Sequence, residues 1–340
     1  MSASAFGKET TAEEVAAAFA LGITGKTSMN EINPFRIRAV LTFQVLITGV
    51  NSNGLGAAVV TALAKHSPKL LILTARNPSK AASVMEDIKA KNPSMQNQYA
   101  LITLDLSSLA SVRAAAAEIR HLTTSIDIVV NNAGVMAIPE RTLSIDGLEM
   151  HLATNFVGHF LLTKLLLPQL RAASTGARVV NITSAGYVLT GFRFSDYNFD
   201  GNKELPPDEQ VAVQVAETMG FNGLGTQTGY VPMVAYAQAN VANMLFTRRL
   251  CDLYGKHGLL SFSAAPGGRL RLLQSGEEWT LISLIVVVTD LQRHLPKDFR
   301  NPYMFYKTPS QGVASFLVAA LDPALSGTVL LSLSMLYFTE

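Results

Sequence analysis

The chain has 340 residues and a formal net charge of +2. This near balance, without a basic patch interleaved with aromatic residues, argues against a nucleic acid as partner. The single cysteine, Cys251, rules out an intramolecular disulfide and is compatible with a reducing compartment, so a cytoplasmic location is expected. Internal repeats, low-complexity linkers and long charge runs are missing from the sequence, which favours one large α/β domain with embellishments.

The N-terminal region contains a helix-start signal. Thr11-Ala-Glu-Glu14 has the form of a capping box, in which a hydroxyl and a carboxylate cap each other's backbone, and an alanine-rich amphipathic run follows it. No positively charged segment with an apolar stretch behind it is found there, so secretion is not expected. The longest apolar run, Leu281 to Val288, is too short to span a bilayer, and no transmembrane segment is expected.

A glycine-rich turn follows the first predicted strand. Val45 to Thr48 is an apolar run of the kind that is buried on both faces of a parallel sheet. It leads into Gly49-Val-Asn-Ser-Asn-Gly54-Leu-Gly56 and then into an alanine-rich predicted helix. Glycines at such a place permit a tight turn, close approach of backbone N–H groups to a pyrophosphate, and close packing of the helix. An ordinary glycine-rich turn between strand and helix is the alternative interpretation.

Strands and helices continue to alternate along the chain. The later apolar runs are Leu70 to Thr74, Ala100 to Leu106, Ile126 to Asn131, Arg178 to Thr183, Leu259 to Ala264 and Thr328 to Leu333. Helical patterns separate them, notably from Leu109 to Leu122. This alternation predicts an α/β fold, a Rossmann-type doubly wound parallel sheet of about seven strands with helices on both faces. A ligand crevice is then expected at the carboxyl ends of the strands.

Short motifs occur in a fixed order along these predicted elements. They are Thr48-Gly49 with Gly54-Leu-Gly56, Asp105-Leu106, Asn131-Asn132-Ala133-Gly134, Asn155 in Thr-Asn-Phe-Val-Gly-His-Phe, Thr183-Ser184, Tyr236, and Pro266-Gly267. In this order and spacing the chain resembles the short-chain dehydrogenase/reductase family, and specifically its fungal and retinol-dehydrogenase-like branch. The resemblance covers nearly the whole chain, although the glycine loop is one residue longer than in the commonest family form.

The resemblance implies roles for three polar residues. Ser184 would hydrogen-bond a substrate carbonyl, Tyr236 would pass a proton to that oxygen, and Asn155 would hold a water in the proton relay. The structural alternatives are a strand-end serine bonded to local backbone, a half-buried core tyrosine, and a mid-helix asparagine bonded to backbone. No metal belongs to the implied site. The residues expected to hold the cofactor are Gly49, Asn53, Gly54, Leu55, Gly56, Arg76, Asp105, Leu106, Asn132, Ala133, Gly134, Tyr236, Asn240, Pro266 and Gly267.

The charge at the end of the second predicted strand indicates which cofactor is used. An NAD site needs an acidic residue there for the ribose 2′-hydroxyl, whereas the 2′-phosphate of NADP needs a cation. The sequence has Arg76 at this point and no acid before Glu86, and Lys80 adds charge nearby. NADP(H) is therefore the expected cofactor, with a solvated surface arginine as the alternative reading of Arg76. Asp105 is expected to contact the adenine edge or to cap the helix that follows.

Position 240 departs from the family pattern. Tyr236 and Asn240 lie one turn apart on the same face of a helix predicted from Ala235 to Leu250. The family has a lysine at this position, whose ammonium ion lowers the pKa of the phenol. An amide replaces it here. Asn240 could still bond a ribose hydroxyl, so cofactor binding is expected to be retained better than turnover.

Two longer segments also depart from the pattern. Residues 28–44 stand where the family runs directly into the first strand, so they are expected to loop out of the sheet or to reflect an unremoved intron. Residues 1–44 are thus an N-terminal helical extension with an insertion, and residues 45–340 are a single NADP-binding domain. Substrate-loop inserts are expected near 186–233 and 268–300. The aromatic residues of the first insert predict either a lid over a lipophilic substrate or a satellite hydrophobic cluster.

Together these features predict an NADP(H)-dependent short-chain dehydrogenase/reductase. Its expected reaction interconverts a carbonyl and an alcohol on a small, lipophilic secondary metabolite. The alternatives are a catalytically impaired NADP-binding protein that acts as a sensor or scaffold, and a damaged gene product that folds poorly. The resemblance also implies a homodimer that pairs through the helices bearing Asn155 and Tyr236.

Overall fold

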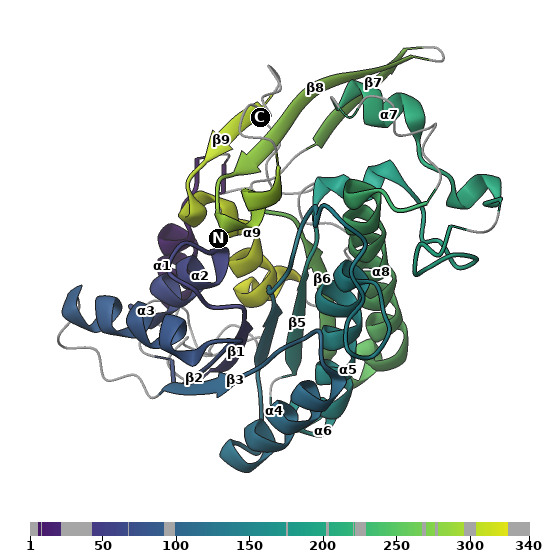
Figure 1. Cartoon of the computed structure of the whole chain (residues 1–340). Helices are drawn as coiled ribbons and strands as arrows, with labels where there is room; N and C mark the ends of the chain where they lie inside the picture. Colours follow the sequence, from purple (N-terminus) through teal and green to yellow (C-terminus); the bar gives the residue numbers. More distant parts are fainter. Residues whose placement is uncertain are drawn as a thin grey trace.

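The computed structural model describes residues 6–7, 9–21, 43–66, 68–91, 99–174, 176–201, 204–219, 221, 229–266, 270–275, 278–295 and 304–325. In this part of the chain the central element is a six-stranded parallel sheet with the order β3-β2-β1-β4-β5-β6 (Figure 1). Its strands are β1 (Gln44–Thr48), β2 (Leu70–Ala75), β3 (Tyr99–Thr103), β4 (Ile128–Asn131), β5 (Ala177–Ile182) and β6 (Leu259–Ala264). The strand order reverses between β1 and β4, which places the crevice of a doubly wound sheet there.

The structure has the predicted fold class. The prediction was possible because strands that are covered on both faces have continuous apolar sequence. In β1, Val45 and Ile47 pack into the cluster on one face, and Leu46 packs into the cluster on the other. The last predicted strand, Thr328 to Leu333, lies outside the described residues. The sheet therefore has six strands in the described part of the chain rather than about seven.

The first strand begins one residue earlier than predicted. Gln44 pairs with Leu70 of β2, so it belongs to the sheet and not to an insertion. Its side chain is buried, yet Nε2 donates to Ser125 Oγ at 2.8 Å and Oε1 accepts from Thr123 Oγ1 at 2.5 Å. The rest of the predicted insertion, residues 28–42, lies outside the described residues.

Helices cover both faces of the sheet (Figure 1). The helices α1, α2, α3 and α9 pack on one face, and α4, α5, α6 and α8 pack on the other. Their bounds are α1 (Ala12–Leu21), α2 (Leu55–Ala64), α3 (Pro78–Lys91), α4 (Leu109–Leu122), α5 (Gly158–Leu165), α6 (Leu167–Arg171), α8 (Pro232–Tyr254) and α9 (Pro309–Leu321). No helix of the described residues is both long enough and apolar enough to cross a membrane.

The predicted capping box opens α1. Thr11 N–H donates to Oε2 of Glu14 at 2.7 Å, and the N–H of Glu14 donates to Oγ1 of Thr11 at 3.3 Å. Ser310 Oγ, at the start of α9, accepts from the N–H of Ala12 at 3.0 Å. The N-terminal helix α1 is thus hydrogen-bonded to α9, close to the other end of the described chain.

Both predicted inserts contain elements of their own. Between β5 and α8 lie η6 (Ala185–Leu189), η7 (Pro207–Glu209) and α7 (Val213–Thr218). After β6 the chain forms a second sheet, β7-β8-β9, of β7 (Leu270–Ser275), β8 (Glu278–Val287) and β9 (Met304–Lys307), with η10 (Asp290–His294) before β9. Phe199, Phe221 and Tyr230 of the first insert pack with α8 residues in one satellite hydrophobic cluster. The short helices η9 (Gly255–His257) and η11 (Pro323–Leu325) complete the described elements.

Candidate active site

The turn between β1 and α2 requires glycine at two positions. Gly49 has φ +72°, and a Cβ there would lie 2.7 Å from Cα of Ala133. A Cβ on Gly56 would lie 2.8 Å from the carbonyl oxygen of Gly49. Gly54 is the N-cap residue of α2 and has no side chain to bond the N–H groups of the first turn. Such a helix start is suited to an anionic group.

Thr48 connects this turn to the helix that carries Asn155. Its Oγ1 accepts hydrogen bonds from the N–H groups of Asn132 and Ala133 at 2.9 and 3.0 Å, and it lies 2.8 Å from Nε2 of His159. Nδ1 of His159 lies 3.1 Å from the backbone oxygen of Asn155, which can only accept. The imidazole proton must therefore sit on Nδ1, and Nε2 accepts the hydroxyl proton of Thr48. One buried histidine thus joins the glycine turn, the end of β4 and the helix of Asn155.

Acid is expected to weaken this connection. Burial lowers the pKa of His159 to about 4 from 6.5, with the hydrogen bond to Asn155 acting in the opposite direction. Between these two pKa values the unfolded chain binds more protons than the folded chain. The free energy of unfolding should therefore decrease by about 3 kcal/mol as the pH falls from about 6.5 to 4. Denaturant unfolding across this range measures the loss. The His159→Gln variant should lack this component, and equal pH dependence in both proteins would contradict the assignment.

Ser184 and Tyr236 come together at the carboxyl edge of the sheet. Ser184 follows β5, where its Oγ accepts from the N–H of Gly186 at 3.2 Å. Tyr236 lies in α8 and is 7% exposed. A Cβ on Gly186 would lie 3.6 Å from both Ser184 Oγ and Tyr236 Cε1, so the two side chains flank the same glycine. Burial raises the pKa of the Tyr236 phenol, and polar interactions with the side chains of Ser184 and Asn240 oppose that change.

The amide of Asn240 turns back onto its own helix. As predicted, Tyr236 and Asn240 lie one turn apart in α8. Nδ2 of Asn240 donates to the backbone oxygen of Tyr236 at 2.8 Å, and the Asn240 side chain is buried. The backbone oxygen of Asn240 lies 3.4 Å from Thr183 Oγ1, which donates to it. A side chain this short places no positive charge beside the phenol.

Asn155 lies in a π-helical turn, η5 (Leu152–Val157). Its Oδ1 accepts from the N–H of Val135 at 2.8 Å, and its Nδ2 donates to the oxygen of the same residue at 2.9 Å. Its backbone oxygen accepts from Nδ1 of His159 and, at 3.2 Å, from Nδ2 of Asn243. The side chain therefore holds the loop after β4 through two backbone hydrogen bonds, and the role of Asn155 in a proton relay stays a prediction.

The other predicted cofactor residues line the same edge. Arg76 directly follows β2 and is exposed. Asp105 follows β3, and its Oδ1 accepts from the N–H and the hydroxyl of Ser107 at 2.9 and 2.6 Å. Asn132 Nδ2 donates to the oxygen of Thr48 at 2.8 Å. Asn53, Leu55, Leu106, Gly134 and Pro266 lie in the segments that follow β1, β3, β4 and β6, and Gly267 lies outside the described residues.

Sequence interpretation missed three buried titratable residues beside this edge. His159 joins Thr48 to Asn155, His151 contacts the ring of Tyr236, and Glu149 pairs with His151. All three fall in one apolar stretch that leads into and through α5. Titratable side chains within this apolar stretch were the available signal, because such groups are rarely buried without a partner.

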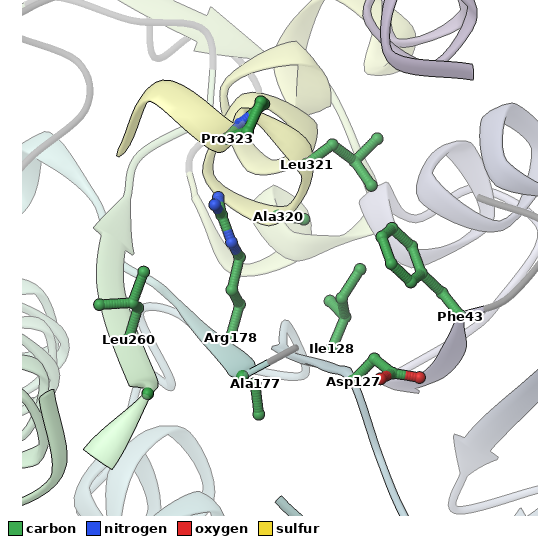
Figure 2. A pocket seen from close by; sticks show the side chains of 11 residues that line it. Phe43, Asp127, Ile128, Ala177, Arg178, Leu260, Ala320, Leu321 and Pro323 are labelled. Carbon is green, nitrogen blue, oxygen red and sulfur yellow. The ribbon is translucent and has the colours of Figure 1, made fainter. Parts of the chain in front are cut away.

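A small cavity lies at the opposite, amino edge of the sheet (Figure 2). It measures about 40 Å³ and is lined by residues from the starts of β4, β5 and β6 and from the end of α9. Nη1 of Arg178, one of its lining residues, donates to the backbone oxygen of Ala319 at 2.9 Å. This volume suits a few water molecules at most, so the cavity belongs to the packing of α9 against the sheet.

The sheet order, the glycine turn after β1 and the Ser184–Tyr236 pair define a dinucleotide-binding class of α/β proteins. A family model described as "short chain dehydrogenase" matches residues 44–198. The chain is 39% identical to "Oxidoreductase fscI" of Fusarium equiseti over 267 residues, which cover 78% of this chain and 95% of that protein. It is 31% identical to "Polyprenol dehydrogenase" of Mus musculus, over 83% of this chain and 72% of that protein. The chain belongs to the short-chain dehydrogenase/reductase family of oxidoreductases.

Solved structures share the fold. An NADPH-bound carbonyl reductase from chicken fatty liver matches with a TM-score of 0.54 and 20% identity, over 86% of this chain and 96% of that chain. A short chain dehydrogenase from Salmonella enterica matches with a TM-score of 0.56 and 20% identity, over 86% of this chain and 96% of that chain. At such identity these matches establish the architecture alone.

Proposed function

We propose that the protein is an NADP(H)-dependent oxidoreductase that interconverts a carbonyl and an alcohol on a small, lipophilic molecule. The observation that carries this proposal is the pairing of Ser184 with Tyr236 at the same sheet edge as the glycine turn. Membership of an oxidoreductase family supports the reaction class. Product analysis after incubation with NADPH and a panel of aldehydes and ketones tests it.

The residues of the β1–α2 turn fit a dinucleotide. Gly49 and Gly56 leave no space for a Cβ, and the start of α2 offers backbone N–H groups to a pyrophosphate. Arg76 directly follows β2, where its side chain would bind the 2′-phosphate of the adenosine ribose. The loop after β4, from Asn132 to Gly134, would border the nicotinamide ribose. When bound, the cofactor supplies the hydride that reduces the carbonyl carbon.

Two side chains would act on the substrate oxygen. Ser184 Oγ already accepts from the N–H of Gly186, so its own hydroxyl proton remains to be donated to a carbonyl. Tyr236 would transfer its phenolic proton to the same oxygen as the carbonyl carbon is reduced. Burial of the phenol excludes water from this transfer and raises its pKa, so the phenol stays protonated until the substrate takes the proton.

The surroundings of Tyr236 support a lipophilic substrate. Met136 and Ala137, from the loop after β4, are buried against the tyrosine ring. Met233 of α8 and two leucines at η10, Leu291 and Leu295, pack on the same cluster. Pockets with apolar walls and few polar groups bind apolar ligands through burial of hydrocarbon surface. The polar end of the substrate would meet Ser184 and Tyr236, and its apolar part would contact the methionines and leucines.

Arg76 is expected to decide the choice of cofactor. NADPH should bind at least about tenfold more tightly than NADH, because the guanidinium group forms paired hydrogen bonds with a 2′-phosphate that NADH lacks. Arg76→Asp should reverse this order, since a carboxylate repels the phosphate and accepts from a ribose hydroxyl. Fluorescence titration measures both affinities, with Arg113→Asp on the exposed side of α4 as the control. Equal affinities in the unaltered protein would remove the basis for assigning NADP(H).

A catalytically impaired NADP-binding protein, acting as a sensor or scaffold, is the second candidate. Asn240 is the observation in its favour, since the amide bonds to backbone and carries no charge. The Ser184–Tyr236 pair and relatives named as oxidoreductases weigh against it. Cofactor binding without alcohol formation from any carbonyl would favour this candidate.

We also propose that a second copy of the chain packs against α5 and α8. Phe160 of α5 and Leu245 of α8 are 40% and 51% exposed, and the ring of Phe160 lies 5.3 Å from that of Phe246 between centroids. Large apolar side chains grouped on neighbouring helices favour burial in an interface. Analytical ultracentrifugation should find a dimer that Leu245→Glu converts to a monomer. A monomeric unaltered protein at high concentration would contradict this.

A further inference from the structure

The loop after β4 brings two residues against Tyr236. Met136 and Ala137 are buried with the Tyr236 ring in one apolar cluster. Ala137 has φ +52°, in the left-handed region, where a residue with a Cβ stays only when its surroundings require it. Contacts from other segments must therefore hold the backbone that forms this wall of the proposed substrate site.

Side chains hold the backbone on both sides of these two residues. Before them, the N–H and the oxygen of Val135 are both bonded to the Asn155 side chain, at 2.8 and 2.9 Å. After them, the N–H of Ile138 donates to Nε2 of His151 at 3.3 Å, and the oxygen of Ile138 accepts from the hydroxyl of Tyr230 at 2.8 Å. Asn155 and His151 belong to η5 and its N-cap, whereas Tyr230 comes from the insert after β5, 92 residues along the chain from Ile138.

The insert holds the ring of Tyr230 in a fixed orientation. This ring packs edge-on against the ring of Phe199, at an angle of 81° and with 5.7 Å between their centroids. Phe199 is 2% exposed, and the guanidinium carbon of Arg193 lies 4.2 Å from its ring centroid. Arg193 is buried too, paired with Asp196 at 2.6 Å, and its N–H donates to Oε1 of Gln238 in α8 at 3.2 Å. Tyr230 thus has a rigid neighbour that is itself bonded to the helix of Tyr236.

The hydroxyl of Tyr230 acts as a hydrogen-bond donor. Burial, and after it the negative charge of Glu149, raise the pKa of the Tyr230 phenol, so the phenol keeps its proton near neutral pH. A phenol has one proton to donate, and the oxygen of Ile138 accepts it. A proton bonded to a backbone oxygen is not offered to a substrate, so this hydrogen bond indicates a positioning role rather than a catalytic one.

We propose that Tyr230 is a positioning residue, whose bond to Ile138 holds Met136 and Ala137 as the wall against which the apolar part of the substrate packs. This inference rests on the proposed function, because that wall belongs to the apolar lining proposed above for a lipophilic substrate. The insert after β5 then influences substrate choice through the loop after β4. Loss of the hydroxyl should weaken the binding of substrates that place much hydrocarbon against the wall. Cofactor binding should not change, because the loop residues proposed to border the cofactor come before Val135.

Tyr230→Phe in the full-length protein tests this role, with one small reactive ketone and one bulky lipophilic ketone as paired substrates. The KM for the bulky ketone should rise about tenfold, which is about what one backbone hydrogen bond is worth, while kcat for the small ketone and the KM for NADPH change less than about twofold. Tyr197→Phe is the matched control, because it is the same substitution in the same insert at a residue that is 46% exposed. An unchanged KM for the bulky ketone overturns the proposal. An equal loss of kcat with both ketones also overturns it, since Tyr230 would then act on the reacting carbonyl.

Amide hydrogen exchange, read by NMR in the full-length protein, is a second test that needs no turnover. The N–H of Ile138 should exchange at least about tenfold faster in Tyr230→Phe than in the unaltered protein, whereas the N–H of Val135, bonded to Asn155, should exchange at the same rate in both. Equal exchange at Ile138 overturns the proposal and leaves the proposed function standing. Faster exchange at Ile138, when the unaltered protein reduces no carbonyl, would support the hold of Tyr230 on the loop and contradict the proposed function, so the two failures are distinguishable.

Discussion

Tyr236→Phe is expected to lower carbonyl reduction by at least about 10³-fold while NADPH affinity stays within about threefold. The phenol is the group that flanks Ser184 in the described site, and phenylalanine keeps the ring but removes the proton that the substrate oxygen needs. The ring packing with Met136 and Ala137 is retained, so folding should be unaffected. Steady-state rates and fluorescence titration with NADPH measure the two effects separately.

The matched control is Tyr254→Phe, the same substitution at the far end of α8. It should leave both turnover and NADPH affinity unchanged. A Tyr236→Phe protein that keeps more than about a tenth of its activity would show that another group, or water, protonates the product. In that case Ser184 and Tyr236 would be structural residues of the sheet edge.

Asn240→Lys is expected to raise the rate of reduction by about 10²-fold. A free phenol titrates near pH ~10, and lowering its pKa by about 3 units is worth about 4 kcal/mol. An ammonium ion about 4 Å away supplies about that much at an effective dielectric constant of about 20. The Asn240 amide donates to the backbone oxygen of Tyr236, and its interaction with the phenol offsets only part of the rise in pKa that burial causes.

Asn240→Met separates charge from length in this experiment. Methionine has nearly the reach of lysine without its charge, so it should not raise the rate. The two variants are compared by initial rates with one reactive ketone at saturating NADPH. An equal gain with methionine would show that the Asn240 amide obstructs the site, and no gain with lysine would show that another group already provides the charge.

The strands and the glycine turn could be predicted because their causes are local. A central parallel strand is apolar on both faces, and a turn with positive φ and a close backbone neighbour needs glycine, as at Gly49. The start of β1 was missed by one residue because Gln44 is polar. Its amide is satisfied by Ser125 and Thr123, which lie far along the sequence, and nothing in the neighbourhood of Gln44 indicates those partners.

The polar network of the site could not be predicted, because it depends on contacts between distant segments. Thr48 and His159 meet only after β1 and α5 have packed on the same sheet. The π-helical turn around Asn155 has no pattern in the sequence, yet it decides which donors its backbone oxygen meets. The contact of His151 with Tyr236 likewise joins the start of η5 to α8. Family resemblance predicted the candidate residues of the site, and the structure shows which hydrogen bonds these residues make.

The most direct test follows a labelled hydride. NADPH carrying deuterium at the transferred position of its nicotinamide is incubated with the unaltered protein and a reactive lipophilic ketone, and the alcohol is analysed by mass spectrometry. We expect the alcohol to carry one deuterium on its carbinol carbon, and we expect no labelled alcohol from Tyr236→Phe. Tight NADPH binding by both proteins without labelled alcohol from either would contradict the assignment of an oxidoreductase and leave a protein that binds the cofactor without using it.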